Sequence, residues 1–177
     1  EFAEIINNTE KIVLSYNIDK YIDSEDKLEL LEIKNADDFK HVNEYKGIIS
    51  PYYLFRGNNK NLGYVEIEAE NDGVIRQYTP FVRINGDYYP SLAATTYLLA
   101  NNRNTMPSKL ELNKKGKFAL NWYGPGRYNL NDKGEQINQT IDYFSFYYVF
   151  SNAIKEKMGK ETSIPENTFK DKVFFVG

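Results

Sequence analysis

Residues 63–100 have the sequence GYVEIEAENDGVIRQYTPFVRINGDYYPSLAATTYLLA, and most of the predicted fold follows from them. Residues 64–69 alternate apolar and polar side chains, as in a half-buried strand, and residues 74–84 form a second extended run. Asn71-Asp72-Gly73 predicts a turn between them, because Gly accepts a positive φ and Asp bonds its own backbone. Asn85-Gly86 predicts a type I′ hairpin, which needs a positive φ at both central residues.

A helix is expected after this hairpin. Residues 87–89 form the second strand of the hairpin. Ser91 can then cap the helix by accepting hydrogen bonds from free backbone N–H groups. Apolar residues then recur at helical spacing until Asn101-Asn102, which predicts a helix from Ser91 to about residue 101. Residues 63–100 therefore predict strands, two tight turns and a helix in close succession.

Further elements are predicted on either side. Residues 1–8 are compatible with the last turns of a helix, and residues 11–16 and 173–176 are apolar runs typical of central, parallel strands buried on both faces. Residues 110–112 and 118–122 predict a second hairpin around a turn that contains Gly116.

Ser145 predicts the N-cap of an amphipathic helix near the C-terminus. Apolar residues recur at helical spacing over residues 146–154, which predicts that this helix packs on a sheet, and Gly159 suits the position after its end. Together the elements predict an α/β fold: a mixed sheet with flanking helices and two β-hairpins, in a single domain.

The charged segment at residues 17–44 has no structure that we can predict, and the role of residues 17–48 is open. Two interpretations remain. The segment is either a solvated excursion or a lid over a ligand cleft, because long insertions in compact domains are often functional or disordered.

Composition excludes several classes of protein. The net charge is −3 and no dense basic patch is present, which argues against nucleic-acid binding. The chain has no cysteine, so disulfides, thiol catalysis and cysteine metal sites are excluded. No apolar run is long enough to span a membrane and no signal peptide is present. Because the sequence lacks an initiator Met and stops at an apolar run typical of a buried strand, we expect an excised piece of a longer protein.

No catalytic residue, cofactor or metal ligand is predicted. His41 is the only histidine, and no nucleophile or metal motif lies near it in the sequence. The acidic residues at 23–32 lack the spacing of a calcium loop, and Gly124-Pro125-Gly126 lacks the Lys-Ser/Thr pair of a phosphate loop.

One set of residues has the character of a ligand site. It combines an amide, an aromatic platform and a guanidinium at the end of a predicted strand, where ligands of open α/β sheets often bind. Its members are Asn121, Trp122, Tyr123 and Arg127. The alternative is that Trp122 is buried under a turn with its indole N–H bonded locally.

Arg76 is a further candidate for ligand binding. Its guanidinium can bind an anion with two parallel hydrogen bonds. The alternative, which we favour, is an ion pair with Asp72 or a neighbouring strand, because such pairs are common.

Several short motifs occur in a fixed order between residues 51 and 177. They are Gly63-Tyr64-Val65, Asp72-Gly73-Val74-Ile75-Arg76, Tyr89-Pro90-Ser91-Leu92-Ala93, Asn121-Trp122-Tyr123-Gly124-Pro125, Phe144-Ser145-Phe146 and residues 169–177, FKDKVFFVG. This ordered set resembles the signature of the CHASE2 domain. The resemblance implies that residues 1–177 are a fragment of one CHASE2-like domain, without the N-terminal part of the domain and the membrane segments.

The resemblance also implies a function. CHASE2 domains are extracytoplasmic sensor domains of bacterial transmembrane receptors, in the periplasm or outside the cell. Their cytoplasmic partners include adenylate or guanylate cyclases and the histidine kinases of two-component systems. We therefore expect a non-enzymatic sensor domain that binds an unknown small molecule or a partner and needs no cofactor. The alternatives are a ligand-free dimerisation or protein-docking module, with homodimerisation left open, and a secreted hydrolase fragment.

Overall fold

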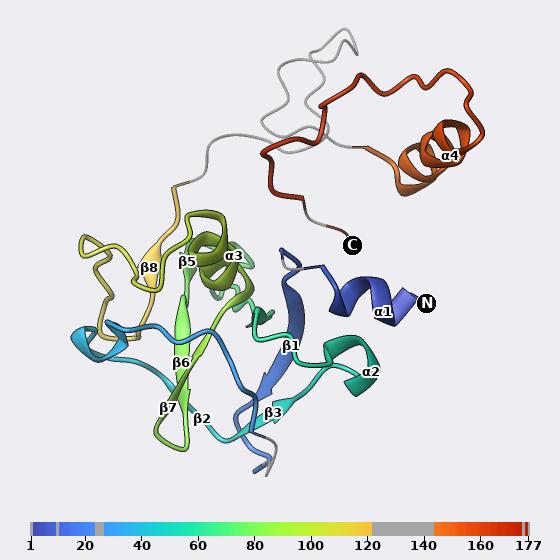
Figure 1. The fold of residues 1–177 in the computed structure, drawn as a ribbon. Coiled ribbons are helices and arrows are strands. Elements are labelled where there is room, and N and C mark those ends of the chain that lie inside the picture. The colour runs from blue at the N-terminus through green and yellow to red at the C-terminus, as the bar shows by residue number, and fades with distance from the viewer. Residues whose placement is uncertain (1, 10, 24–26, 122–143, 175, 177) are drawn as a thin grey trace, which may run out of the picture. The chain divides into compact units, whose positions relative to one another are not determined.

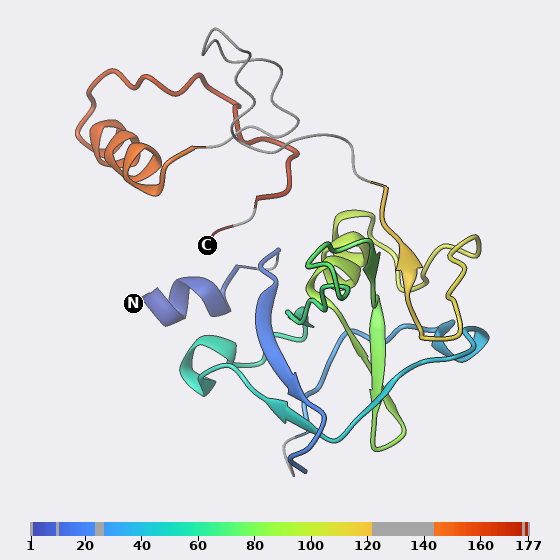
Figure 2. The same cartoon turned by 180° about the vertical axis from the view of Figure 1, so that it is seen from behind.

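The structure is a computed structural model of the chain, and it describes residues 2–9, 11–23, 27–121, 144–174 and 176. The chain divides into two compact units, Glu1–Asn121 and Trp122–Gly177, which we call the first and second units and describe separately. The described residues form three small sheets and four α-helices (Figure 1, Figure 2), so the predicted α/β class is confirmed.

β1 (Leu14–Asp19) is the central strand of the first sheet, between β3 (Gly47–Ile49) and β4 (Leu62–Tyr64). It runs parallel to β4 and antiparallel to β3. Alternate residues Tyr16 and Ile18 are buried, so the strand has one core face rather than the two predicted. The opposed residues include Leu14 with Leu62 and Asn17 with Ile49.

The second sheet contains the predicted hairpin. β6 (Phe81–Ile84) and β7 (Asp87–Pro90) are antiparallel, and β2 (Glu44–Tyr45) pairs in parallel with β6. Asn85 and Gly86 have φ values of 52° and 87°, as a type I′ turn requires.

α3 (Leu92–Ala100) begins at the predicted cap. The Oγ atom of Ser91 accepts a hydrogen bond from the backbone N–H of Ala94, at 3.2 Å. The helix packs on β4 and β7 (Figure 1), and an isolated parallel bridge between Tyr64 and Ser91 links the first sheet to the end of β7.

Two hydrophobic clusters form the core of the first unit. One contains Tyr16, Ile18, Leu28, Tyr45, Ile48, Leu62, Tyr64, Val82, Ile84 and Tyr89. The other contains Ile33, Ala36, Phe81, Ala94, Leu98 and Met106. Leu28, Ile33 and Ala36, the last in the short 3₁₀ helix Ala36–Asp38, come from the segment that could not be predicted. That segment is therefore part of the core and not a wholly solvated excursion.

The strands predicted at 64–69 and 74–84 are shorter than expected. Residues 65–69 belong to no strand, although the N–H of Val65 still donates to the carbonyl of Tyr16 at 3.0 Å, and Val65 and Ile67 are exposed. The second run divides into β5 (Gln77–Tyr78) and β6, because Pro80 lies between them and has no N–H to donate to a ladder.

The turn around Gly116 forms as predicted, with a φ of 67°, but its strand has a different partner. β8 (Phe118–Ala119) pairs antiparallel with β5, and residues 110–112 contain no strand. The rings of Tyr78 and Phe118 meet edge to face across this pair, with centroids 6.1 Å apart. β8 thus pairs with β5, which is distant in the sequence, and not with the nearby residues 110–112.

α1 (Phe2–Asn7) is the helix predicted at residues 1–8, and α2 (Tyr53–Arg56) lies beside it in both views (Figure 1, Figure 2). The side-chain amide of Asn7 donates a hydrogen bond to the carbonyl of Leu54, at 3.1 Å. No residue of α2 is buried.

In the second unit, α4 (Phe146–Lys157) has both predicted ends. The Oγ atom of Ser145 accepts from the N–H of Tyr148 at 3.1 Å. Gly159 has a φ of 66°, its N–H donates to Glu156, and the N–H of Lys160 donates to Lys155. These two bonds form a Schellman motif.

The described residues of the second unit contain no sheet, so the packing of α4 on a sheet stays a prediction. Phe146 and Phe150 are exposed, and their rings stack with centroids 5.9 Å apart. Residues 173, 174 and 176 form no strand, because no described segment of this unit offers them a hydrogen-bonded partner. Phe174 contacts Phe169 edge to face instead, at 4.9 Å.

Candidate functional site

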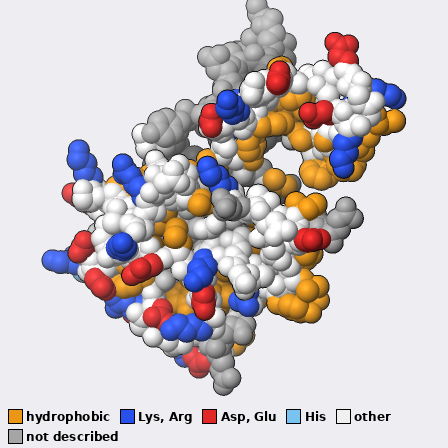
Figure 3. All heavy atoms as spheres, viewed as in Figure 1, with side chains coloured by type: hydrophobic (Ala, Val, Ile, Leu, Met, Phe, Trp, Pro, Cys, Tyr) orange, Lys and Arg blue, Asp and Glu red, His pale blue; other side chains and the backbone are white. Residues whose placement is uncertain are grey.

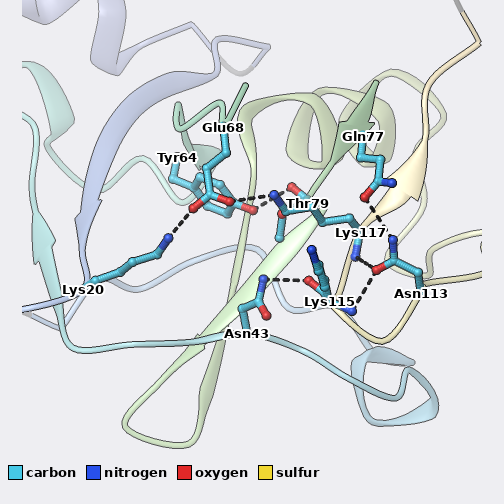
Figure 4. Close-up of polar contacts among 9 residues, drawn as sticks. All are labelled: Lys20, Asn43, Tyr64, Glu68, Gln77, Thr79, Asn113, Lys115 and Lys117. Carbon is cyan, nitrogen blue, oxygen red and sulfur yellow. Dashed lines mark hydrogen bonds and ion pairs between the residues drawn. The ribbon is translucent and has the colours of Figure 1, made fainter. Parts of the chain in front are cut away.

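A cleft of about 1000 Å³ opens in the first unit. Its walls come from Lys20, residues 43–45, residues 68–72, Gln77 and the lysines at 114, 115 and 117. Lys20 follows β1, and residues 43–45 lead into β2 and include it. Residues 68–72 lie between β4 and β5, Gln77 belongs to β5, and the three lysines precede β8 (Figure 4). A smaller pocket of about 210 Å³ beside α3 is almost wholly apolar, so it offers few groups that could orient a ligand.

Glu68 lies at the centre of the polar network in this cleft (Figure 4). The ammonium of Lys117 donates to Oε2 of Glu68 at 2.6 Å, and the ammonium of Lys20 donates to Oε1. The two lysines, Lys117 first, lower the pKa of Glu68 to about 2, and Glu68 raises the pKa of Lys20. One carboxylate thus joins segments that follow β1, follow β4 and precede β8.

The turn before β8 is held by side-chain amides. Oδ1 of Asn113 accepts from the N–H groups of Lys115 and Lys117, at 2.8 and 3.2 Å. The amide of Asn113 donates to Gln77 on β5 at 3.0 Å, and the amide of Asn43 donates to the carbonyl of Lys115 at 2.9 Å. The turn is therefore fixed to two other walls of the cleft.

A second turn forms the acidic wall. The N–H of Gly73 donates to the carbonyl of Glu70 at 2.8 Å, and Oδ1 of Asp72 accepts from the N–H of Val74 at 3.0 Å. Arg76 closes the turn, because its guanidinium contacts Glu70 at 2.9 Å and Asp72 at 2.8 Å. Both carboxylates thus share one guanidinium, which leaves this turn with a net negative charge.

Tyr45 and Glu66 lie near Lys20. The ammonium of Lys20 is 5.1 Å from the centre of the Tyr45 ring, close enough for a cation–π contact. Burial raises the pKa of the Glu66 carboxyl, and its Oε2 atom is buried without a hydrogen-bond partner among the described residues. Glu66 is thus the least well compensated charge of this network.

The residues predicted to bind a ligand have three different outcomes. Trp122, Tyr123 and Arg127 lie outside the described residues. Asn121 is exposed just after β8, and its neighbour Leu120 donates a backbone hydrogen bond to the carbonyl of Arg76, at 2.8 Å. Asn121 and Arg76 are thus brought close by the β5–β8 pair, but neither lines the cleft, and Arg76 forms the predicted ion pair with Asp72.

Sequence reasoning missed Lys20, Glu68, Lys115 and Lys117. A signal for Glu68 was present, because Glu66, Glu68 and Glu70 alternate at a spacing of two and so share one side of an extended segment. The lysines that neutralise Glu68 are distant from it in the sequence, and no local pattern connects them.

The first unit is thus a mixed α/β domain with a polar cleft built from separate segments. The family model of the CHASE2 domain matches residues 1–177, so the chain belongs to the CHASE2 family, as the motifs suggested. CHASE2 is a family of extracytoplasmic sensor domains and not of catalytic domains. No curated protein and no solved structure matches the chain.

Neither a membrane-spanning helix nor a metal cluster occurs in the residues that the structure describes. None of the helices there has both the length and the apolar character needed to cross a bilayer. No group of three or more His, Asp or Glu side chains in the same residues is arranged to hold a metal ion.

Proposed function

We propose that the chain is the ligand-sensing, extracytoplasmic domain of a bacterial transmembrane receptor. It binds a small polar molecule in the cleft and passes the signal to a cytoplasmic adenylate or guanylate cyclase or to a kinase. Membership of the CHASE2 family supports the sensor role. The observation that supports ligand binding is the polar cleft, whose walls come from four separate parts of the first unit.

The cleft offers a physical route for a signal. A ligand shifts a conformational equilibrium only if it binds one arrangement better than another. A molecule that contacts Lys20, residues 68–72 and the turn before β8 depends on the relative positions of all three segments. Its binding energy therefore favours one arrangement of β1, β4 and β8.

The test is a thermal-shift panel on the whole chain with sugars, amino acids, nucleotides, organic acids and divalent metals. A ligand at about 100 times its Kd should stabilise the fold by roughly 2.7 kcal/mol. Asn71→Trp, which places a bulky ring in the cleft, should abolish the shift. Asn58→Trp, at an exposed turn outside the cleft, should leave it unchanged.

The same ligand should change the cyclase or kinase rate of the receptor that contains this domain. A ligand that binds the cleft but leaves that rate unchanged would contradict the sensor role. A panel in which no compound binds would contradict ligand binding itself.

One observation favours the alternative of a ligand-free dimerisation module. Tyr52, Tyr53 and Phe55 cluster on the exposed surface around α2, with ring centroids 4.9 and 6.0 Å from that of Tyr52. Hydrophobic side chains gather at this position in the space-filling view (Figure 3). Apolar patches of this kind often mark interfaces.

Self-association would be measured by sedimentation velocity over a concentration series. On this alternative the chain dimerises and Tyr53→Asp restores the monomer, whereas Tyr21→Asp, at an isolated exposed tyrosine, has no effect. A chain that stays monomeric at the highest concentration would contradict it.

A further inference from the structure

The carboxylates of the cleft already have cationic partners within the chain itself. Glu68 is bound by Lys20 and Lys117. Glu70 and Asp72 share the guanidinium of Arg76, at 2.9 and 2.8 Å. The remaining one, Glu44, lies 3.5 Å from the guanidinium of Arg83. A cationic ligand would therefore have to displace an existing partner from each carboxylate.

Two lysines of the cleft, in contrast, have no ion-pair partner among the described residues. Lys114 and Lys115 line it, and neither ammonium forms an ion pair with any part of the chain that the structure describes. In Figure 4 the side chain of Lys115 extends from its turn in the direction of Glu68 and Lys117. The positive charge left over in the cleft is thus concentrated on one wall.

That wall is held in place before any ligand arrives. Asn113 and Asn43 bind the backbone of the turn at 2.8–3.2 Å, and a Cβ atom on Gly116 would collide with the carbonyl oxygen of His41. A fixed backbone lowers the entropy lost when the two lysines close on an anion.

Carboxylates elsewhere in the cleft limit the size of an anionic ligand. Glu44, Glu70 and Asp72 line the cleft beside the lysines, so a long polyanion would meet three carboxylates. A compact anion would meet fewer of these carboxylates. The amide side chains of Asn43, Asn71 and Gln77 can orient its neutral groups.

We propose that the cleft binds a small organic anion with carboxylate or phosphate groups, held by Lys114 and Lys115 and competing with Glu68 for Lys117. This inference rests on the proposed sensor function and adds the chemical class of the ligand. It also gives the site a coupling step, since an anion that draws Lys117 away loosens the contact between Glu68 and the segment before β8.

The experiment uses the whole chain and four small probes at constant ionic strength. Succinate and inorganic phosphate are the anions, succinamide is the neutral counterpart of succinate, and putrescine is a cation. Binding is measured by thermal shift and by calorimetric titration. Succinate, phosphate or both should bind, and succinamide and putrescine should not. A response to only one of the two anions separates carboxylate from phosphate chemistry.

Three variants locate the site. The double variant Lys114→Gln/Lys115→Gln should weaken anion binding at least tenfold, while Lys109→Gln, at an exposed lysine outside the cleft, should leave it unchanged. Glu68→Gln removes the competitor for Lys117 and should tighten anion binding several-fold. If the substitution only damaged the fold, the affinity for the anion would fall. Tighter anion binding in Glu68→Gln would therefore indicate competition for Lys117 and not a structural defect.

Equal responses to succinate and succinamide, or unchanged affinity in the double lysine variant, would overturn the inference. If a sugar or another neutral compound binds and Asn71→Trp abolishes its binding, the anion inference fails and the sensor function stands. If an anion binds as described but the output of the receptor does not change, the sensor function fails and the anion site stands.

Discussion

Glu68 is the residue whose charge most directly connects the walls of the cleft. Its side chain is 37% exposed, so solvent weakens both of its ion pairs, and we expect Glu68→Gln to cost only about 0.5–1 kcal/mol at pH 7. Urea unfolding of the two proteins measures this difference. Glu111→Gln, at an exposed carboxylate that lines no cleft, is the matched control.

The same residue predicts a pH dependence with a defined sign. The folded chain lowers the pKa of Glu68 from 4.5 to about 2, so the ionised carboxylate stabilises the fold. This contribution is fully present above the ordinary pKa and is lost as the pH falls through the folded value. The difference in unfolding free energy between the chain and Glu68→Gln should therefore shrink between about pH 4.5 and pH 2. A difference that is constant over this range would contradict the ion pairs.

Glu66 should behave in the opposite way. Burial raises the pKa of its carboxyl, so the folded state binds the proton more tightly and ionisation destabilises the fold at neutral pH. Glu66→Gln should then raise Tm by about 1–3 °C at pH 7 and give a smaller gain at a pH below the ordinary pKa of the carboxyl. Differential scanning calorimetry at both pH values measures the effect, and a fall in Tm at pH 7 would show that the carboxylate is well satisfied.

At the scale of elements, the contact between β4 and α3 depends on one missing side chain. A Cβ atom on Gly63 would lie 2.5 Å from the backbone nitrogen of Leu92 and 2.8 Å from the carbonyl carbon of Ser91, and it would also collide with Cα of Leu92. These are backbone atoms at the first turn of a capped helix, so they cannot move alone.

We therefore expect Gly63→Ala to destabilise the fold by about 2–3 kcal/mol, within the range seen for overpacked cores. Gly73→Ala is the comparison, because its Cβ meets open space and only the left-handed φ of 78° opposes it, at about 1–2 kcal/mol. Chemical unfolding ranks the two, and an equal or smaller effect at Gly63 would mean that α3 can shift.

The elements that could be predicted from the sequence are those defined by neighbouring residues. The hairpin at Asn85-Gly86 and the caps at Ser91 and Ser145 each depend on atoms within a few residues, so short patterns identify them. The pairing of β5 with β8 depends on residues about forty positions apart, and a local hairpin was predicted in its place. The same reason hid most of the candidate site, because Glu68 finds its lysines on segments far away in the sequence.

Burial was harder to predict than element type. α4 has the apolar spacing of a packed helix, yet Phe146 and Phe150 are exposed in the second unit. Periodicity shows which face of a helix is apolar and does not show what covers that face. Conversely, charges at residues 23–32 concealed Leu28, which is 4% exposed and part of the core.

At the scale of the whole molecule, the first unit contains both hydrophobic clusters and the cleft. We expect Glu1–Asn121 to fold without the second unit. The amide NMR spectrum of this piece should overlay on the matching signals of the whole chain, apart from residues next to the cut. Collapse of its signals to a narrow, unfolded range would show that the second unit is needed for folding.

The position of β1 in its sheet has a consequence for the time course of folding. Leu14 pairs with Leu62 and Asn17 with Ile49, so the first long strand of the chain finds both neighbours only after long loops have closed. Such distant pairings are slow compared with helix formation, because the entropy of loop closure is lost before the contacts form. When the chain is synthesised from its N-terminus, the side chains of Tyr16 and Ile18 stay exposed until the segment that contains Tyr64 has been made. During that interval the nascent β1 is an unpaired strand with apolar side chains, which another chain or a chaperone can bind.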